Sequence, residues 1–326
     1  MMKFEYHEAR SIPEAISLAN GLPGRTRWLA GGTELFPKMK SRAVTADHLV
    51  NLKRIPELAG VGRNHSVIRV GPLTSLEELA NSKSLGKVFS ALCEAARGVA
   101  SPNIRRAATI GGNLCQAPNC LYFIHRNLWR LPECHAAQGN TCNAIQGARK
   151  CTAMSPADIA PALIALGAEL EIKGPENKGM PVESFFVSSG VTVIHKNEMI
   201  GTIAIPNPPL PSGSAYLKYS RRKTIDYAIV SVGVRLVLES DGDHCLEARV
   251  ALGGMGPVPF RARKAEDLLT GERITEDTIS RAAELASRGG QPWADLHASN
   301  SLRRRLAGLL TMRALALAFT RARAAG

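Results

Sequence analysis

The sequence lacks the marks of several large classes of protein. It has no stretch of about 18 uncharged apolar residues, so no membrane span is predicted. The first ten residues are mixed and charged and have no apolar core, which argues against a signal peptide and predicts a cytoplasmic protein. The chain also has no zinc finger, no aromatic RNA-binding signature and no helix-turn-helix pattern. Nucleic acid is therefore not an expected partner, despite a net charge of +13.

The length and the alternation of strands and helices predict an α+β protein. A chain of 326 residues is long enough for two or three packed domains. The clearest linker is the proline-rich stretch 206–213. We expect a strand-and-helix domain at 1–208, followed at 212–326 by a smaller domain with an antiparallel sheet and three helices.

Local patterns predict most of the individual elements. Helices are expected at 12–20, 35–40, 75–81, 86–99, 156–166, 262–270, 275–287 and 300–323. Strands are expected at 27–30, 67–71, 168–172, 191–194, 200–205, 229–238 and 246–252. Serine caps are expected at Ser75 and Ser155. The arginine-rich last helix should pack on its own domain or on a partner, with these leucines inward: Leu302, Leu306, Leu309 and Leu315.

The seven cysteines are clustered. Only Cys93 and Cys245 lie outside one 37-residue window, which holds Cys115, Cys120, Cys134, Cys142 and Cys151. The last four have the spacing C-x13-C-x7-C-x8-C, and four thiolates are the usual ligands of a 4Fe–4S cluster. Zinc also accepts four thiolates, but paired knuckles are absent among these four. Spacing alone leaves iron–sulfur, zinc and free thiols open, with His125 and His135 as loop residues or additional ligands.

Two glycine turns each follow an apolar run. They are Gly31-Gly32-Thr33 and Gly111-Gly112-Asn113, and each can direct successive backbone N–H groups at one anion. A helix predicted after the first turn would favour a phosphate there. The alternative for each is a plain tight turn. No G-x-G-x-x-G motif occurs, so an ordinary Rossmann site is not predicted.

Charged residues later in the chain suit a flavin site. Asp158, in Ser155-Pro156-Ala157-Asp158, can accept a hydrogen bond from a ribose hydroxyl or a flavin ring N–H, or can simply sit in the first turn of a helix. The segment from Lys218 to Tyr227 is rich in positive charge, which can stabilise a reduced, anionic flavin. Its alternative is a solvated strand edge or turn.

Taken in order, these segments resemble the FAD subunits of the xanthine oxidase (molybdenum hydroxylase) family. The resemblance rests on 29–36, 109–113, 155–158 with 161–163, and 253–257 with 260–262, and it covers nearly the whole chain. It implies a two-subdomain FAD-binding domain of the PCMH type, then a smaller α+β domain. One departure is that the residue usually found between Ala157 and Asp158 is missing.

The resemblance also implies roles for individual residues. The FAD pyrophosphate would be wrapped by Leu29, Ala30, Gly31, Gly32, Thr33, Glu34, Leu35 and Phe36, and by Thr109, Ile110, Gly111, Gly112 and Asn113. Val99 would lie by the adenine. Further FAD contacts would be Asp158 and Lys218, with Ile200 and Tyr227 as additional candidates.

Most members of the family pass almost directly from the second glycine loop to the Asp158 segment. Here a cysteine insert at about 115–153 intervenes, and it resembles the beta subunits of 4-hydroxybenzoyl-CoA reductases, which carry a 4Fe–4S cluster there. In that pattern Cys115 is not a ligand and the next four cysteines are. A related aldehyde oxidoreductase subunit has an insert with different spacing, so the insert does not identify the substrate.

The resemblance implies an electron-transfer subunit of a heteromeric enzyme. Partner subunits would supply molybdopterin and 2Fe–2S clusters, in a dimer of heterotrimers. Basic residues of the insert would steer an acidic carrier such as ferredoxin, or would merely solvate a loop: Arg126, Arg130, Arg149 and Lys150. Alternatives are a subunit of an aldehyde- or N-heterocycle-oxidising molybdenum enzyme, a stand-alone flavin oxidoreductase and a zinc-stabilised binding module.

Overall fold

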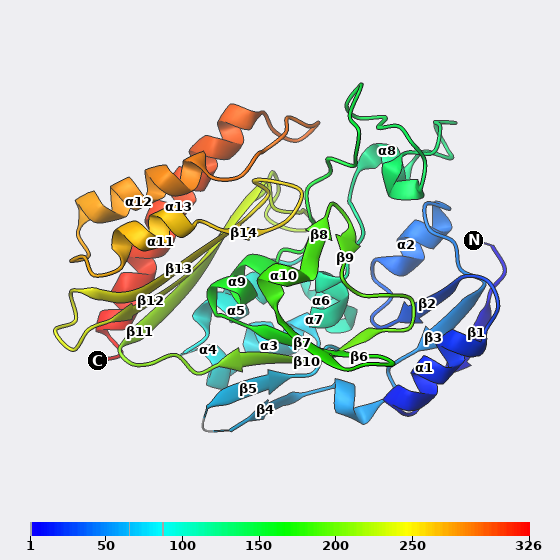
Figure 1. The fold of residues 1–326 in the computed structure, drawn as a ribbon, viewed down its shortest axis with the longest axis horizontal. Helices are drawn as coiled ribbons and strands as arrows, with labels where there is room; N and C mark the ends of the chain where they lie inside the picture. The colour runs from blue at the N-terminus through cyan, green and yellow to red at the C-terminus, as the bar shows by residue number, and fades with distance from the viewer. Residues whose placement is uncertain (1, 65, 87) are drawn as a thin grey trace.

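The computed structural model describes residues 2–64, 66–86 and 88–326. The chain folds into three blocks that lie side by side, with its termini at opposite ends of the molecule (Figure 1). The cysteine insert rises at one edge, above the N-terminal block and beside a loop of the C-terminal block. Throughout the described ranges, every helix is too short or too polar to serve as a membrane span.

The N-terminal block is a small parallel sheet. Its strands lie in the order β1-β3-β2, with bounds β1 Glu5–Glu8, β2 Thr26–Leu29 and β3 His48–Asn51. Two helices make the crossovers, α1 Ile12–Gly21 and α2 Leu35–Lys40. Because the sheet is parallel, the loop after β2 leaves at its carboxyl edge, where the first glycine turn begins.

The middle block is a five-stranded antiparallel sheet in the order β4-β5-β10-β6-β7. The strands are β4 Val61–Arg63, β5 Val67–Val70, β6 Glu169–Lys173, β7 Lys178–Pro181 and β10 Met199–Pro206, with a separate hairpin of β8 Phe186–Ser188 and β9 Val191–Thr192. Its helical segments are short: η1 Pro56–Leu58, α3 Leu76–Asn81, α4 Lys83–Gly86, α5 Ser90–Gly98, α6 Pro102–Ala107, α7 Ile110–Leu114, α9 Ala160–Ala165 and α10 Val182–Phe185.

The C-terminal block is an antiparallel sheet covered by three helices. The strands run in the order β11 Ser212–Tyr219, β12 Val230–Leu238, β13 Cys245–Gly253 and β14 Phe260–Arg261. The helices are α11 Arg263–Leu269, α12 Glu276–Arg288 and α13 Asn300–Arg323. Every residue of β12 is buried, because α13 covers the strand on one side and α9 of the middle block contacts it as well. The two larger blocks therefore share a packed interface.

A buried arginine fastens the last helix to the sheet. Arg303 is almost fully buried and donates to the carbonyls of Ile229 and Gly254, at 2.5 and 3.0 Å. Its guanidinium also pairs with Asp295 at 2.6 Å. These contacts hold the loop before α13 against the turn after β13, and that loop forms one wall of the cavity described below.

The cysteine insert has little regular structure. It contains only α8 Leu121–Ile124 and the single turn η2 His135–Ala137. Phe123 is buried with Cys134 and Ala43 in a small cluster of its own. Arg126 donates to the carbonyl of Ala43 at 3.0 Å, so the base of the insert is tied to the loop after α2.

Most predicted elements are confirmed to within a few residues, but several details are wrong. The expected helix from 156 begins only at Ala160, with Ile159 rather than Ser155 as its cap, because Asp158 is drawn into an ion pair with the C-terminal sheet. The expected helix at 86–99 is confirmed as α5 only from Ser90. Strand β11, which carries Lys218, was not predicted.

The orientation expected for α13 is half right. Leu306 and Leu315 are buried, whereas Leu302 and Leu309 are 38% and 37% exposed. The buried face is dominated by small residues such as Ala314 and Ala318, which let the helix approach the sheet closely. A Cβ placed on Gly213 would lie only 2.1 Å from the carbonyl oxygen of Ala318.

Candidate functional site

The two glycine loops lie against each other. A Cβ on Gly31 would fall 1.9 Å from the carbonyl oxygen of Ala107, just before the second loop, so only glycine fits there. Gly32 has a φ of +71°, a conformation that glycine adopts without strain. A side chain on Gly111 would likewise collide with Pro72, at 2.6 Å. The loops that the sequence singled out therefore form one backbone surface.

The two loops offer different groups to a ligand. Among the described residues, no hydrogen bond is recorded from the backbone N–H groups of Gly31, Gly32 and Thr33. In the second loop the N–H of Gly112 already donates to the Oγ1 of Thr109, at 3.1 Å. Helices α2 and α7 have six and five residues, so their dipoles add little. The free N–H groups of the first loop are the better anion donors.

Glu34, at the end of the first loop, is not free. Its carboxylate pairs with the buried Lys38 one helical turn later. Lys38 also donates to the carbonyl of Ala117 at 2.8 Å, and Ala117 N–H donates back to Glu34 at 3.3 Å. Burial lowers the pKa of Lys38, and the neighbouring carboxylate counters that shift. Sequence reasoning missed Lys38, whose only signal was a lysine four residues after an acid.

Asn113 connects the second loop to the Asp158 segment. Its Oδ1 accepts the N–H of Ile159 at 3.2 Å, and its Nδ2 lies 3.4 Å from the Oε1 of Gln116. Asn113 is buried, so these contacts satisfy groups that water does not reach. The residues that flank the cysteine insert are thus joined to each other.

A buried ion pair lies at the junction of the two larger blocks. Lys218 of β11 approaches Asp158 with 2.6 Å between Nζ and Oδ2, and both side chains are less than 10% exposed. The same ammonium donates to the carbonyls of Gly98 and Asp226, at 2.9 and 2.8 Å. The other carboxylate oxygen accepts the N–H of Ala228 at 3.2 Å. Burial raises the pKa of Asp158, and the Lys218 ammonium counters that rise.

This pair gathers several of the predicted flavin residues. Gly98 precedes Val99, and Asp226 precedes Tyr227, so Lys218 holds the backbone beside both. All three ammonium hydrogens of Lys218 have acceptors within the protein. Lys218 therefore positions the backbone that surrounds the site. Whether it also contacts FAD stays a prediction.

Ile200, another residue predicted to contact the flavin, does not lie beside the Asp158–Lys218 pair. It lies in β10, paired with Ile172, and is 4% exposed within the main hydrophobic core. Gly98 and Asp226, which receive the lysine, were not predicted, because a backbone acceptor leaves no pattern in the sequence.

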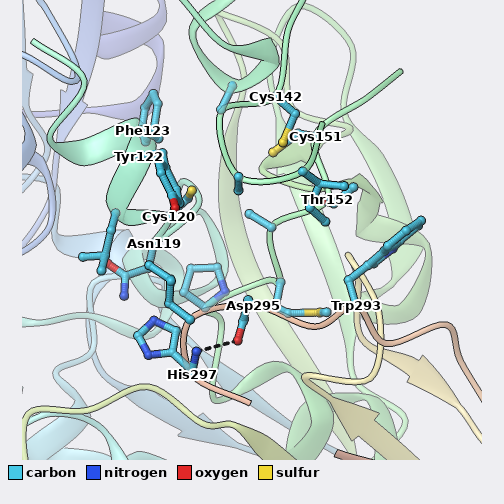
Figure 2. Close-up of a pocket in the computed structure, with 18 of the residues that line it drawn as sticks. Asn119, Cys120, Tyr122, Phe123, Cys142, Cys151, Thr152, Trp293, Asp295 and His297 are labelled. Carbon is cyan, nitrogen blue, oxygen red and sulfur yellow. Dashed lines mark hydrogen bonds between the residues drawn. The ribbon is translucent and has the colours of Figure 1, made fainter. Parts of the chain in front are cut away.

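Four cysteines surround one cavity of about 300 Å³ between the insert and the C-terminal block (Figure 2). They are Cys120, Cys134, Cys142 and Cys151, and all four are free thiols. Figure 2 shows the side chains of Cys142 and Cys151 converging on each other. Ser189 donates a hydrogen bond to the sulfur of Cys151 at 3.3 Å.

The other three cysteines lie elsewhere. Cys115 is exposed and does not line the cavity. Cys93 and Cys245 are buried in separate hydrophobic cores, where burial raises their pKa values to about 11 and about 12. Thiols of this kind stay protonated and are poor metal ligands.

The spacing of the sulfur atoms bears on the choice between zinc and an iron–sulfur cluster. The sulfurs of one zinc tetrahedron lie about 3.8 Å apart. Within the part of the chain that the structure describes, the groups of three ligand atoms mutually within 4.8 Å contain no cysteine. A four-iron cage binds its thiolates at more widely separated corners than a single zinc ion does.

Two histidines of the insert were considered as ligands. His135 lines the cavity, but its Nε2 bonds the carbonyl of Ala148 at 2.9 Å. His125 packs on Trp129, with ring centroids 5.1 Å apart, and lies outside the cavity lining. Both fit the role of loop residues.

The cavity also reaches the flavin side of the site. Tyr227 and Asp226 line it, so it adjoins the loop held by Lys218. On the opposite wall lie Trp293 and His297, from the loop that Arg303 fastens. Tyr227 is thus the predicted flavin residue that lines the same cavity as the four thiols.

Comparisons with known proteins match both parts of the chain. A model described as the FAD binding domain in molybdopterin dehydrogenase matches residues 2–208. A second model, the CO dehydrogenase flavoprotein C-terminal domain, matches residues 215–318. The cysteine segment falls inside the first match.

Individual relatives are also FAD-binding or medium subunits of oxidoreductases. The carbon monoxide dehydrogenase medium chain of Afipia carboxidovorans is 30% identical over 98% of both chains. The aldehyde oxidoreductase FAD-binding subunit of Escherichia coli is 30% identical over 87% of this chain and 91% of that one. A solved structure of carbon monoxide dehydrogenase from Hydrogenophaga pseudoflava, lacking the Mo-pyranopterin moiety, gives a TM-score of 0.82 at 28% identity and covers 98% of each chain.

The contact between the glycine loops can be tested with Gly31→Ala. The added methyl group would collide with the carbonyl of Ala107 and push the loops apart. We expect the FAD dissociation constant to rise roughly tenfold or more, about 1.4 kcal/mol, in a flavin fluorescence titration. Gly21→Ala is the control, because a Cβ there meets nothing within 4 Å. Equal FAD affinity in both variants would contradict the arrangement.

The buried ion pair can be tested with Asp158→Asn and Lys218→Met. Each leaves its partner buried without a counter-charge, so each should lower the free energy of unfolding by about 3–5 kcal/mol in urea denaturation. Asp277→Asn is the control, because it removes an exposed pair with Arg281 and should cost less than about 1 kcal/mol. Similar losses in all three variants would show that the buried pair has no special role.

Proposed function

Because this chain belongs to the family of FAD-binding medium subunits of the molybdenum hydroxylases, we propose that it carries a 4Fe–4S cluster beside its FAD and passes electrons between an external carrier and its partner subunits. The observation that carries the proposal is the cavity lined by four free cysteines and by Tyr227. FAD and an iron–sulfur cluster, when bound, supply the redox chemistry that amino-acid side chains lack.

The protein's own residues have separate tasks in this proposal. The N–H groups of Gly31, Gly32 and Thr33 would bind the FAD pyrophosphate, supported from behind by Ala107. The pair of Asp158 with Lys218 would fix the walls next to Val99 and Tyr227. These contacts shape the FAD site before any ligand arrives, which lowers the entropic cost of binding.

The insert would hold the cluster. Cys120, Cys134, Cys142 and Cys151 would bind its four irons, and the Ser189 hydroxyl would hydrogen-bond one ligating sulfur. Hydrogen bonds to such sulfurs and exclusion of solvent tune the potential of a cluster.

Family membership implies an oxidoreductase assembled from several subunits. The large subunit would bind molybdopterin and react with substrate, and the small subunit would hold 2Fe–2S clusters, in a dimer of heterotrimers. Within the described residues, the cysteines outside the insert set are scattered: Cys93, Cys115 and Cys245. We therefore expect partner chains to supply the remaining clusters.

The insert favours a 4-hydroxybenzoyl-CoA reductase-like enzyme, in which electrons run inward to the molybdenum subunit. The alternative is a subunit of an aldehyde- or N-heterocycle-oxidising enzyme, and the aldehyde oxidoreductase relative keeps that alternative open. A stand-alone flavin oxidoreductase is a further candidate. It predicts turnover by the isolated chain, whereas the main proposal predicts none without the partners.

The cluster proposal is tested by metal analysis. Protein purified without oxygen should contain four irons, four sulfides and one FAD per chain. Serine at any one of the four positions 120, 134, 142 and 151 should lower the iron content and bleach the visible absorption of the cluster. Cys115→Ser is the matched control and should keep all four irons, since Cys115 does not line the cavity. A colourless protein with one zinc would overturn the proposal.

The exposed tip of the insert is suited to an acidic electron carrier such as ferredoxin. Leu128 and Trp129 are 76% and 47% exposed, and the basic residues Arg130, Arg149 and Lys150 are exposed as well. Exposed apolar and basic side chains are both common in transient docking surfaces for acidic partners. Arg126 is not part of this surface, because it is half-buried and bonded to Ala43.

Charge reversal tests the docking surface. The triple change Arg130→Glu, Arg149→Glu and Lys150→Glu should slow electron transfer with ferredoxin roughly tenfold or more at low salt and flatten its dependence on ionic strength. The control triple, Lys53→Glu, Arg54→Glu and Arg63→Glu, alters exposed residues far from the insert and should leave both unchanged. A rate insensitive to salt in the unmodified complex would rule out electrostatic steering.

A further inference from the structure

A second candidate metal site lies far from the flavin and the cysteines, on the small N-terminal sheet. Glu5 and His7 are two residues apart on β1, so their side chains lie on the same face. His48 of β3 is the direct parallel neighbour of Glu5. Three potential metal ligands therefore come from two adjacent strands, which are the most rigid supports the fold offers.

The three ligand atoms form a compact triangle. His7 Nε2 lies 3.2 Å from His48 Nδ1. Glu5 Oε2 lies 3.3 Å from His48 Nδ1 and 3.8 Å from His7 Nε2. In a zinc tetrahedron with nitrogen and oxygen ligands at 2.0–2.2 Å, neighbouring ligand atoms are about 3.3 Å apart. The triangle thus matches one face of such a tetrahedron with little adjustment.

Hydrogen bonding alone satisfies this arrangement poorly. A carboxylate only accepts, and each neutral imidazole nitrogen either donates or accepts. If His48 Nδ1 donates a hydrogen bond to Glu5, this nitrogen has no lone pair left to accept one from His7. If His48 Nδ1 instead accepts from His7, this nitrogen and the Glu5 carboxylate face each other as two acceptors. A cation would use all three lone pairs at once.

We propose that Glu5, His7 and His48 bind one Zn²⁺ ion, with water at the fourth position. Two imidazoles and a carboxylate suit this ion, and His48 is largely buried while Glu5 is exposed and leaves an entry path. Among the described strands, β1 pairs only with β3, the central strand of its sheet. The ion would link these two strands. Its role is a clip that holds the first strand in place.

A second group of possible ligands provides an internal control. The ligand atoms of Glu239, Asp241 and His244 also lie within 4.8 Å of one another, in the turn between β12 and β13. There Asp241 already accepts the backbone N–H groups of Asp243 and His244, and its other oxygen bonds the imidazole of His244. Its oxygens are committed to the turn, so His244→Ala should not change zinc binding.

The test is equilibrium dialysis of the full chain against Zn²⁺ alone, after anaerobic purification so that the cysteine cavity keeps its own contents. We expect one zinc ion to bind per chain. His7→Gln and Glu5→Gln should each lower the zinc affinity roughly tenfold or more, whereas His244→Ala should leave it unchanged. Because zinc bound elsewhere is common to all variants, the difference between variants reports this site. The glutamine variants alter the more exposed ligands, and their FAD content verifies that they are folded.

Cobalt supplies a spectroscopic check. Co²⁺ at a site of two imidazoles and a carboxylate should give only weak visible bands, without the intense near-ultraviolet charge transfer of thiolate ligation. These bands should disappear in His7→Gln. Equal zinc affinity in the unmodified chain and in both glutamine variants would overturn the proposal, as would cobalt bands that arise only from thiolates.

Discussion

The buried ion pair between Asp158 and Lys218 is the contact on which the arrangement of this molecule depends. It joins the segment after the cysteine insert to the first strand of the C-terminal sheet, in a region almost free of water. Each charge would be costly to bury alone, and together they are stable because backbone groups fill the remaining positions. Moving the two larger blocks apart would separate the two charges and leave each without its partner. The pair therefore favours one relative position of the blocks.

The cysteine segment, about forty residues long, leaves from this junction and returns to it. Asn113 stands before the insert and Ile159 after it, and the hydrogen bond between them closes the insert at its base. The entropy cost of a loop grows only slowly with its length once its ends are fixed. A long, irregular segment can therefore be carried by an FAD-binding frame that remains intact, as the match over residues 2–208 indicates.

Local features of this fold were predictable, and long-range ones were not. Helix α1 and the start of α3 at its Ser75 cap follow from nearby residues, because propensity and capping act within one turn. The start of helix α9 was predicted wrongly by the same reasoning. Asp158 bonds to a strand sixty residues away, and this contact holds the backbone before Ala160 out of the helix. Leu302 and Leu309 were misplaced because alanines such as Ala314 and Ala318 take up much of the buried face of α13.

The candidate site shows the same division. Gly31 and Gly32 were found from sequence because their steric demands exclude other residues, and the four clustered cysteines were found because their spacing is uneven. The shared cavity was not predictable, because Tyr227 and Trp293 reach it from separate loops of the C-terminal block. Lys218 positions the first loop through the carbonyl of Asp226, and Arg303 positions the second through the carboxylate of Asp295. The C-terminal domain thus shapes the cavity through contacts between distant residues, and such contacts leave no motif in the sequence.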